Sequence, residues 1–328
     1  MKIFLTGASG YVGAHLVNRL VKEGHHLHLL VRSLEKNPQL NSKHLTVFEG
    51  NIFQKEVIKK AMIGCDCIFH LAACTSIWLK NEEDYFNINV NGTNNILDLA
   101  YELKIKKTVI TSTAGVYGPS IDGEVNENTK REIGYFNNYE KSKAISEEHI
   151  KRYILEKNMD IVIVNPTRIY GPFLQGDSFS FTLLIEKYIS GNWKFIPGDG
   201  EKIGNYIFID DVIEGHVQAM NVGTKGESYL LAGINCTYNE FFNQLKKASN
   251  LDYKLFYTPI WIQLIYGYIQ LFKAVVFKIN PSVVPKWIKR GNYNWEVSSK
   301  KMTEMLNVKI TSLDEGMKKT ISWLNRSK

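Results

Sequence analysis

The segment TGASGYVGAHL, at residues 6–16, restricts the fold of this chain more than any other. It places Gly7, Gly10 and Gly13 at intervals of three, after the apolar run KIFLTG and at the start of the helical pattern GAHLVNRLVKEG. Glycines placed in this way allow a tight turn, close approach of the backbone to a pyrophosphate, and close packing of helix on strand. The N–H groups at the helix start can then bind phosphate. The segment therefore predicts a dinucleotide-binding turn. The other residues expected to contact the dinucleotide there are Ser9, Tyr11 and Val12.

Short apolar runs alternate with helical patterns through the first half of the chain. Strands are predicted at KIFLTG, HLHLLVR, LTVFEGN, CDCIFHLAA, KTVITST and DIVIVNP. Helical connections between them imply right-handed crossovers, and hence an α/β fold with a doubly wound parallel sheet. Loops rich in glycine and proline after residue 165 indicate a smaller, mainly helical C-terminal lobe. We expect a cofactor-binding domain at 1–165, rejoined by about 205–232, and a substrate lobe at 166–204 and 233–328.

Charge and cysteine content exclude several classes of function. The net charge is +7 over 328 residues, but the basic residues are scattered and no nucleic-acid-binding motif occurs, which favours an anionic ligand over nucleic acid. Gly7 comes too early for the apolar stretch of a signal peptide. The cysteines form no CxxC pair and suit a reducing compartment, so we expect a cytoplasmic protein. The four cysteines, read as small core residues, are Cys65, Cys67, Cys74 and Cys236.

The run GHHLHLL contains three histidines close together, as some metal-binding sites do. His25 and His26 fall at the start of a predicted strand, and His28 alternates within it. No carboxylate or cysteine completes a ligand set, so no metal site is predicted.

The stretch FNNYEKSKAISEEH places Tyr139 four residues before Lys143 in a helical pattern. Residues at i and i+4 project from the same side of a helix, so the phenol and the ammonium would lie close together. Such a pair is ordinarily a feature of an exposed helix. It becomes informative here because a cofactor site is predicted for it to serve.

A series of motifs across nearly the whole chain occurs in the order and spacing of a known family. They are TGASGYVG, FHLAA, NVNGTNNIL, TSTAGVYG, YEKSK, NPTRIYGP and FIDDVIEGH. In these the sequence resembles the extended short-chain dehydrogenases/reductases of the NAD-dependent epimerase/dehydratase superfamily, in the branch similar to dihydroflavonol reductases. The resemblance implies a Rossmann-type cofactor domain, a C-terminal substrate lobe and NAD(P)-dependent oxidoreductase activity.

The same resemblance implies catalytic roles. Tyr139 would be the general acid/base at the substrate carbonyl or alcohol; because a free tyrosine has a pKa near 10, it needs a nearby cation to act as a base. Lys143 would supply that charge and hydrogen-bond the nicotinamide ribose. The hydroxyl that orients the substrate oxygen is a serine in many relatives, and its position is occupied here by Thr113, with Ser112 as the second candidate.

Further cofactor contacts follow from the resemblance. Relatives usually carry aspartate against the adenine at the position of Asn51, whose carbonyl can still accept a hydrogen bond. Asn89 and Asn91, in NVNGT, either support the cofactor and a proton path or are polar residues at a helix start. His70 is expected to pack within its strand. The remaining cofactor-binding residues implied are Ile52, Leu71, Ala72, Ala73 and Pro166.

The second strand distinguishes between the two nicotinamide cofactors. It ends at Arg32 and Ser33, where an enzyme that uses NAD would carry an acidic residue for the ribose 2′-hydroxyl. A guanidinium cannot accept that hydrogen bond but pairs well with a 2′-phosphate. The sequence therefore favours NADP(H) over NAD.

Two alternatives to net redox chemistry remain. A sugar-nucleotide epimerase or dehydratase would hold NAD tightly and commonly carries an arginine for the substrate diphosphate. The corresponding stretch, GDGEKIGNYIFIDD, has Gly204 and Asn205 at that place, and Lys202 is a misplaced substitute. A cofactor-binding scaffold without catalysis would usually lose Tyr139 and Lys143. Net hydride transfer is favoured over both.

The lobe contains LFYTPIWIQLIYGYIQLF, eighteen residues without a charge. Gln263, Gly267 and Gln270 form a narrow polar stripe on this otherwise apolar pattern. The segment 255–279 is expected to be a helix that packs on the core and roofs an apolar pocket; peripheral attachment to an anionic membrane is the alternative. The basic residues that follow are Lys273, Lys278, Lys286, Lys289 and Arg290.

The expected substrate is a small, apolar carbonyl or alcohol compound. An aromatic lining of the pocket is the reason for expecting an apolar substrate. The protein is expected to be a monomer or a homodimer. The expected lining residues are Trp78, Tyr117, Phe136, Tyr170 and Phe173.

Overall fold

The computed structural model describes residues 1–172 and 181–326. Its centre is a seven-stranded sheet in which every pair of neighbours is parallel, in the order β10-β6-β5-β4-β1-β2-β3. This confirms the predicted doubly wound sheet, with the change of winding direction between β1 and β4. The strands are β1 (Lys2–Thr6), β2 (His26–Val31), β3 (Leu45–Glu49), β4 (Cys67–His70), β5 (Lys107–Thr111), β6 (Ile161–Pro166) and β10 (Ser228–Leu231).

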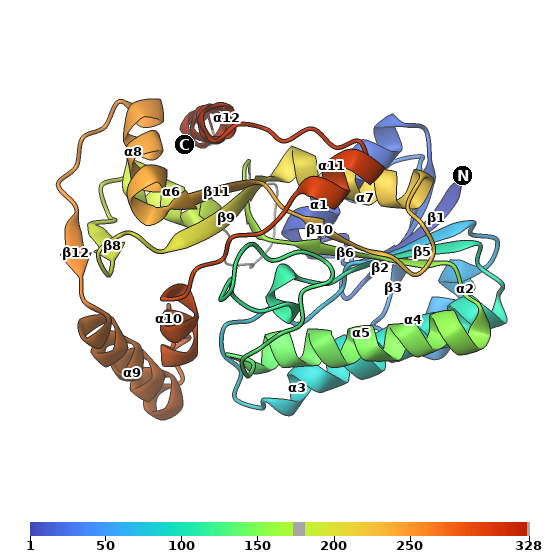
Figure 1. Cartoon of the computed structure of the whole chain (residues 1–328). Coiled ribbons are helices and arrows are strands. Elements are labelled where there is room, and N and C mark those ends of the chain that lie inside the picture. The colour runs from blue at the N-terminus through green and yellow to red at the C-terminus, as the bar shows by residue number, and fades with distance from the viewer. Residues whose placement is uncertain (173–180, 327–328) are drawn as a thin grey trace.

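Helices cover both faces of the large sheet (Figure 1). On one face lie α1 (Tyr11–Lys22), α7 (Ile209–Asn221) and α11 (Lys300–Met305), whereas α12 (Leu313–Arg326) packs mainly against α8 (Tyr238–Ser249) of the C-terminal region. On the other lie α2 (Lys55–Met62), α3 (Glu83–Phe86), a π-helix (Asn87–Gly92), α4 (Thr93–Glu102) and α5 (Asn138–Lys157). Strands covered on both sides read as continuous apolar runs, and all four residues of β4 and all six of β6 are buried. Two apolar cores result, one on each face.

The lobe is built around a smaller sheet with the order β11-β9-β7. Its strands are β7 (Arg168–Tyr170), β9 (Ile203–Phe208) and β11 (Ile234–Thr237), and a second, two-stranded sheet pairs β8 (Phe195–Pro197) with β12 (Phe256–Thr258). The helices are α6 (Phe181–Ile189), α8 (Tyr238–Ser249), α9 (Ile260–Phe277) and α10 (Pro285–Gly291). Of the segment expected to rejoin the large sheet, β10 does so, whereas β9 pairs with β7 and β11.

The apolar segment of the lobe differs from its expected form in two ways. Residues 256–258 form β12, and the helix begins only after Pro259 and continues to Phe277. Proline favours a helix start because it lacks an N–H and cannot lie within a helix without disrupting it. The helix does not form the expected roof over a pocket: its apolar face is exposed, with Trp261 and Phe272 each 61% accessible.

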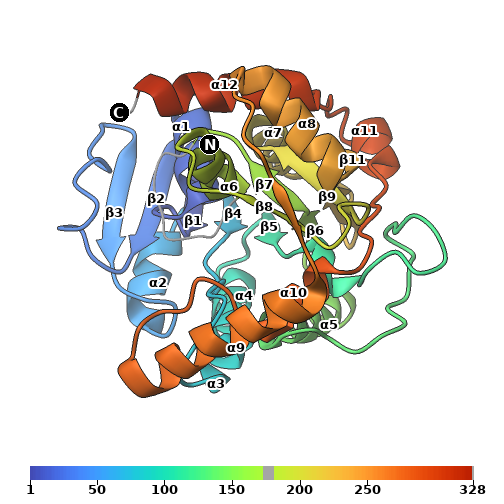
Figure 2. The same cartoon turned by 90° about the vertical axis from the view of Figure 1, so that its left-hand side faces the viewer.

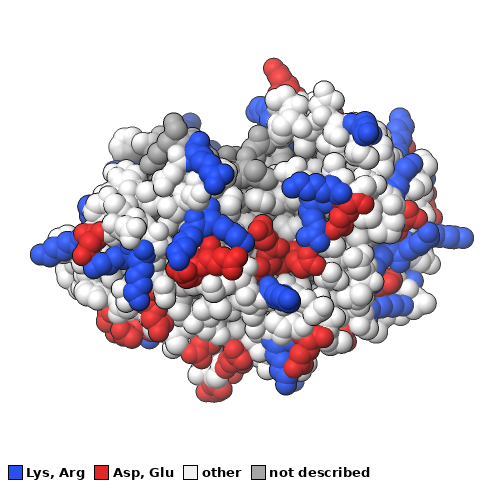
Figure 3. All heavy atoms as spheres, turned by 90° about the horizontal axis from the view of Figure 1, so that it is seen from above, with Lys and Arg blue, Asp and Glu red and all other residues white. Residues whose placement is uncertain are grey.

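Charged side chains show no single-sign patch on the face seen from above, where acidic and basic groups are interleaved (Figure 3). This pattern agrees with the scattered charges of the sequence.

Candidate active site

The glycine-rich turn between β1 and α1 is shaped by close backbone contacts. Gly7 has φ +81°, and a Cβ there would lie 2.8 Å from the backbone N of Ala72. A Cβ on Gly13 would lie 2.0 Å from the carbonyl oxygen of Gly7, so α1 can pack on the turn only because this residue is glycine. A Cβ on Gly10 would meet only the Gly7 carbonyl oxygen, at 3.3 Å. Two of the glycines therefore serve packing, and the third leaves one side of the turn accessible to a ligand.

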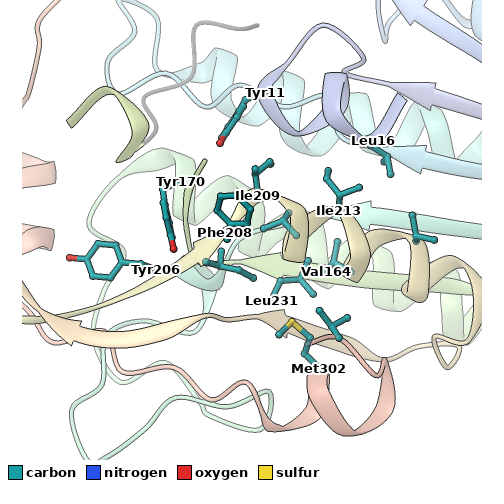
Figure 4. Packing of buried hydrophobic residues seen from close by; sticks show 14 of the residues in the cluster. Tyr11, Leu16, Val164, Tyr170, Tyr206, Phe208, Ile209, Ile213, Leu231 and Met302 are labelled. Carbon is teal, nitrogen blue, oxygen red and sulfur yellow. The ribbon is translucent and has the colours of Figure 1, made fainter. Parts of the chain in front are cut away.

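The start of α1 fits a phosphate group. Gly10 is its N-cap, and no side chain among the described residues caps the first N–H groups of the helix. Uncapped N–H groups and the positive end of the helix dipole favour an anion. The turn thus fits the pyrophosphate of a nicotinamide dinucleotide. Tyr11 is buried in the core beneath the turn (Figure 4), and the hydrogen-bonding partner of its side chain is Thr182.

The residues after β4, β2 and β3 lie at the same carboxyl edge of the sheet as this turn. Ala72 donates its N–H to Thr6 Oγ1 at 3.2 Å, which joins the segment after β4 to the end of β1. Arg32 directly follows β2 and is exposed, and its charge acts on Cys74 in the loop after β4. Among the described residues, no hydrogen bond or ion pair engages its guanidinium.

Two residues after β3 have contacts within the protein that bear on their expected roles. The Asn51 side chain accepts a hydrogen bond from the N–H of Phe53 at 2.9 Å and so caps its own turn. Ile52 is buried, and a Cβ on Gly92 would lie 2.1 Å from its Cδ1. Its side chain therefore packs inward, which leaves its backbone as the part that can face a ligand.

Helix α5 aligns three ionisable side chains on one face: Tyr139, Lys143 and Glu147, at i, i+4 and i+8. The helix starts at this point because the Asn137 side chain caps it, accepting a hydrogen bond from the N–H of Glu140 at 2.9 Å. Lys143 Nζ donates to the Thr111 carbonyl at 2.7 Å, at the end of β5. The expected face shared by phenol and ammonium is therefore present, directed at the carboxyl edge of the sheet.

Burial controls the protonation of this face. It raises the pKa of Tyr139 to about 12, although a hydrogen bond with Thr113 and the positive charge of Arg290 both act to lower this pKa. It lowers the pKa of Lys143 to about 8, although the negative charge of Glu147 acts to raise this pKa. Burial also raises the pKa of Glu147, which accepts a hydrogen bond from Asn165 Nδ2 at 2.7 Å. Each shift favours the neutral form of its group.

The two candidate hydroxyls on the loop after β5 face different partners. The Thr113 side chain hydrogen-bonds Tyr139 and also accepts from the N–H of Gly115 at 3.2 Å. Ser112 is 5% exposed and is directed at Glu147, whose pKa its hydroxyl lowers. The geometry therefore places Thr113 beside the phenol, as expected for the hydroxyl that would orient a substrate oxygen.

A buried ion triad next to Tyr139 was not anticipated from the sequence. Glu140 is 1% exposed; its Oε1 lies 2.6 Å from Arg290 Nε and its Oε2 lies 3.0 Å from Arg131 Nη2. Arg290 belongs to α10 in the lobe, so this carboxylate links the helix that carries Tyr139 to the lobe. The YEKSK motif contains Glu140, but nothing in the sequence points to a partner 150 residues away.

The polar residues near the π-helix have structural partners. Asn89 is fully buried: its Oδ1 accepts from the N–H of Cys74 at 2.7 Å, and its Nδ2 donates to Ser142 Oγ at 2.9 Å. It therefore fixes the loop after β4 against α5, whereas exposed Asn91 donates only to Asn87, at 3.2 Å. His70 packs as expected, with burial lowering its pKa to about 3.

The expected aromatic lining is only partly assembled. Phe136 lies 5.0 Å from the Tyr293 ring and 6.2 Å from that of Trp295, between centroids. Tyr117 packs against a small cluster around Ala114, and Trp78 is partly exposed. Tyr170 was wrongly expected in the pocket: it is 1% exposed and its ring packs in the core against that of Phe208 (Figure 4). Phe173 lies outside the described residues.

Gly204 occupies the position at which a sugar-nucleotide epimerase or dehydratase would carry an arginine for the substrate diphosphate. An arginine from the neighbouring strand lies beside it. A Cβ on Gly204 would be 2.1 Å from Arg168 Nη1. The guanidinium carbon of Arg168 lies 5.4 Å from the ring centroids of Phe181 and Tyr206 and 5.6 Å from that of Tyr238. The lobe thus contains a cation near that position although the local sequence lacks one.

The described residues contain no group of three or more His, Cys, Asp or Glu side chains arranged to bind a metal ion. The strand histidines instead have protein partners: His28 Nδ1 pairs with the Ala61 carbonyl at 2.6 Å, and His26 Nε2 with Thr46 Oγ1 at 3.0 Å.

Known proteins resemble this chain throughout its length. Residues 3–232 match the model of the NAD dependent epimerase/dehydratase family. A putative dihydroflavonol 4-reductase of Synechocystis is 26% identical, covering 98% of this chain and 93% of its own length. Sterol demethylase protein B of Methylococcus capsulatus is 29% identical over 76% of this chain and 75% of its own. The UDP-glucuronic acid 4-epimerase of Bacillus cereus, solved with UDP-glucuronic acid and NAD, is 23% identical and has a similar fold, with a TM-score of 0.78 and full coverage of both chains.

Proposed function

The chain belongs to the NAD-dependent epimerase/dehydratase family, and we propose that within it the protein is an NADP(H)-dependent oxidoreductase. It would transfer a hydride between nicotinamide and a carbonyl or alcohol of a small, apolar substrate. The observation that carries the proposal is the hydrogen bond of Tyr139 with Thr113, one helical turn from Lys143, at the same carboxyl edge of the sheet as the glycine-rich turn. A cytoplasmic location and a monomeric or homodimeric state are part of the same proposal.

In the proposed reaction, the bound cofactor supplies or accepts the hydride, and residues of this chain handle the proton. Tyr139 donates its phenolic proton to the substrate oxygen as a carbonyl is reduced, and the Thr113 hydroxyl holds that oxygen in place. Because burial raises the pKa of Tyr139 to about 12, the phenol is protonated at neutral pH, the form needed for donation. Lys143 would hydrogen-bond the nicotinamide ribose, and its position one helical turn from Tyr139 supports this role.

The other cofactor contacts are proposed on the sequence motifs and on their place at the carboxyl edge of the sheet. The backbone around Gly7, Gly10 and Gly13 would bind the pyrophosphate at the start of α1. Arg32 would bind the 2′-phosphate of NADP, and its exposed guanidinium supports this role because no carboxylate among the described residues neutralises it.

The names of two relatives refer to a dihydroflavonol and to sterols, neither of which is a sugar nucleotide. Together with Phe136, Tyr293 and Trp295 packed near the N-terminal end of α5, they support an apolar substrate.

Arg168 favours a second candidate function. A buried guanidinium beside Gly204 is suited to an anionic substrate group such as the diphosphate of a sugar nucleotide. The protein would then be an epimerase or dehydratase that keeps NAD bound through an oxidation and a re-reduction. The absence of an arginine at positions 204 and 205 is therefore a weaker argument against this function than it is in the sequence alone.

Two assays on the purified protein distinguish these functions. Carbonyl compounds are screened for consumption of NADPH, and UDP- and GDP-sugars are screened in parallel for isomerisation without net change in reduced nicotinamide. We expect stoichiometric NADPH consumption with an apolar ketone or aldehyde. Conversion of a sugar nucleotide with NAD already bound would replace the first candidate by the second.

Cofactor preference is tested by titrating NADPH and NADH into the wild type and Arg32→Ala. We expect NADPH to bind at least about tenfold more tightly, the scale of one charged contact, and the variant to lose that preference. Arg152→Ala, which removes an exposed arginine on α5, is the matched control and should keep the preference. Equal affinities in the wild type would refute the assignment to NADP.

A further inference from the structure

Helix α9 has the reverse of the polarity expected for a helix on the surface of a protein. Its buried residues are Gly267 and Ala274, and partly buried Gln263 and Gln270 belong to the same stripe. A Cβ on Gly267 would lie 2.6 Å from Ile288 Cδ1, so α10 packs closely on this small and polar stripe. Leu264 and Leu271 flank the stripe and are partly buried, whereas most of the other large apolar side chains of the helix are exposed. The helix is long and apolar enough to cross a membrane by length and composition, but length alone does not establish its surroundings.

The apolar surface of α9 is too wide for one packed element to cover. At about 100° per residue, its exposed apolar side chains extend over about 200° of the circumference. The side chains that are at least about half exposed are Trp261, Ile265, Tyr266, Tyr268, Ile269, Phe272, Val275, Val276 and Phe277. Phe195, Phe256 and Tyr257, on β8 and β12, are 52–58% exposed and lie on the same side of the molecule as α9 (Figure 2). A single partner helix would bury one stripe of this surface, whereas a fluid apolar phase would cover all of it.

The chain segment that carries this surface has charges of one sign only. From residue 253 to residue 295 the chain contains no aspartate or glutamate and six basic residues. Arg290 pairs with Glu140 and Lys286 pairs with Glu82. Lys273, Lys278 and Lys289 are exposed, and no carboxylate among the described residues pairs with them. Cations at the edge of an apolar surface complement the anionic headgroups of a lipid bilayer.

Both ends of α9 return to the body of the protein. Its N-terminal end follows β12, which is hydrogen-bonded to β8. Its C-terminal end leads within a few residues to α10, which is fixed by the ion pair between Arg290 and buried Glu140. A helix across the bilayer would have to carry α10 to the far side and break that pair. The helix can therefore lie in the plane of a membrane surface with these contacts intact.

We propose that α9 docks this protein on the surface of an anionic lipid bilayer. The helix lies in the interface plane with its apolar face among the acyl chains, and Lys273, Lys278 and Lys289 contact the headgroups. The proposal rests on the lobe alone and is independent of the proposed reaction. Because α10 joins α9 to α5, docking would hold the N-terminal end of α5 on the lipid-facing side of the protein.

Flotation with vesicles tests this directly. The full-length protein is mixed with vesicles of phosphatidylcholine alone, or with added phosphatidylserine, and centrifuged through a density gradient. We expect flotation with the anionic vesicles, and weaker flotation without phosphatidylserine or at high salt. Ile265→Glu combined with Phe272→Glu should weaken binding at least about tenfold. Combined Lys273→Gln, Lys278→Gln and Lys289→Gln should do the same through loss of charge.

The control is Leu155→Glu, which places the same charge on an 82% exposed leucine of α5 and should leave flotation unchanged. Circular dichroism checks that each variant is folded, and size-exclusion chromatography with light scattering gives the oligomeric state. Failure of the wild type to float with anionic vesicles would overturn the proposal. So would a discrete dimer that the double glutamate variant dissociates while neither protein floats, because α9 would then bind a second copy of the chain.

Discussion

Helices α5 and α9 both depart from the usual amphipathic arrangement, in opposite ways. The inward face of α5 carries the buried charged residues Glu140, Lys143 and Glu147, whereas the outward face of α9 carries large apolar residues such as Trp261 and Phe272. An ordinary surface helix buries apolar side chains and exposes charged ones. Helix α10 lies between them: its Arg290 pairs with Glu140 of α5, and its Ile288 packs against Gly267 of α9.

The two helices differ in the interaction partners that the structure provides for these unusual side chains. Every buried charge on α5 has a partner within the chain: two arginines for Glu140, the Thr111 carbonyl for Lys143, and the Asn165 amide for Glu147. Such partners offset the large cost of removing a charge from water. The apolar face of α9 has no such partner among the described residues. The buried charges of α5 therefore have all their partners within this chain. The exposed apolar groups of α9 have none there, which indicates that a partner outside the chain covers them.

The largest effect is expected from breaking the ion triad of α5. Glu140→Gln leaves Arg131 and Arg290 buried near each other without a counter-charge, and removal of one partner of a buried ion pair costs about 3–5 kcal/mol. Urea unfolding of the wild type and the variant measures the difference. Glu148→Gln, an exposed neighbour on the same helix, is the control and should change the free energy of unfolding by less than about 0.5 kcal/mol. Equal stability of Glu140→Gln and the wild type would show that this carboxylate does not hold the lobe in place.

The next effect is expected from the phenol at the start of α5. Tyr139→Phe removes one hydroxyl and should lower the turnover rate about a hundredfold or more, equivalent to about 2.7 kcal/mol, by removing the proton donor. Cofactor affinity and the free energy of unfolding should remain close to those of the wild type. The control is Tyr153→Phe, on the same helix, which loses the hydrogen bond of its hydroxyl to Asp98 of α4 and should keep its activity. Near-normal turnover by Tyr139→Phe would assign the phenol a structural role only.

The parts of the molecule that the sequence predicted are those specified by local spacing. Gly7, Gly10 and Gly13 fall between one strand and one helix, so their spacing alone indicates the turn. Tyr139 and Lys143 share a face because the helical repeat requires it. The alternation of apolar runs and helical patterns likewise predicted the parallel sheet, since strands buried on both faces must be apolar throughout.

The parts that the sequence did not predict depend on contacts between distant residues. Glu140 meets Arg290 across 150 residues, and Arg168 lies beside Gly204 only because β7 and β9 are neighbouring strands. An apolar pattern in the lobe predicted a helix but not which face it would bury. The small and polar stripe of Gln263, Gly267 and Gln270 was recognised, but only the packing of α10 shows that this stripe faces inward.

The smallest effect is expected on the outward face of α9, and it completes the comparison. Phe272 is 61% exposed, so Phe272→Ala removes little buried surface and should change the free energy of unfolding in lipid-free buffer by less than about 0.5 kcal/mol. Phe241→Ala, at a fully buried position in α8, should cost about 3–5 kcal/mol because it opens a cavity in the core. Urea unfolding of both variants gives the two values side by side. A loss of more than about 1.5 kcal/mol for Phe272→Ala would mean that protein covers this face in solution, and α9 would then resemble an ordinary buried helix.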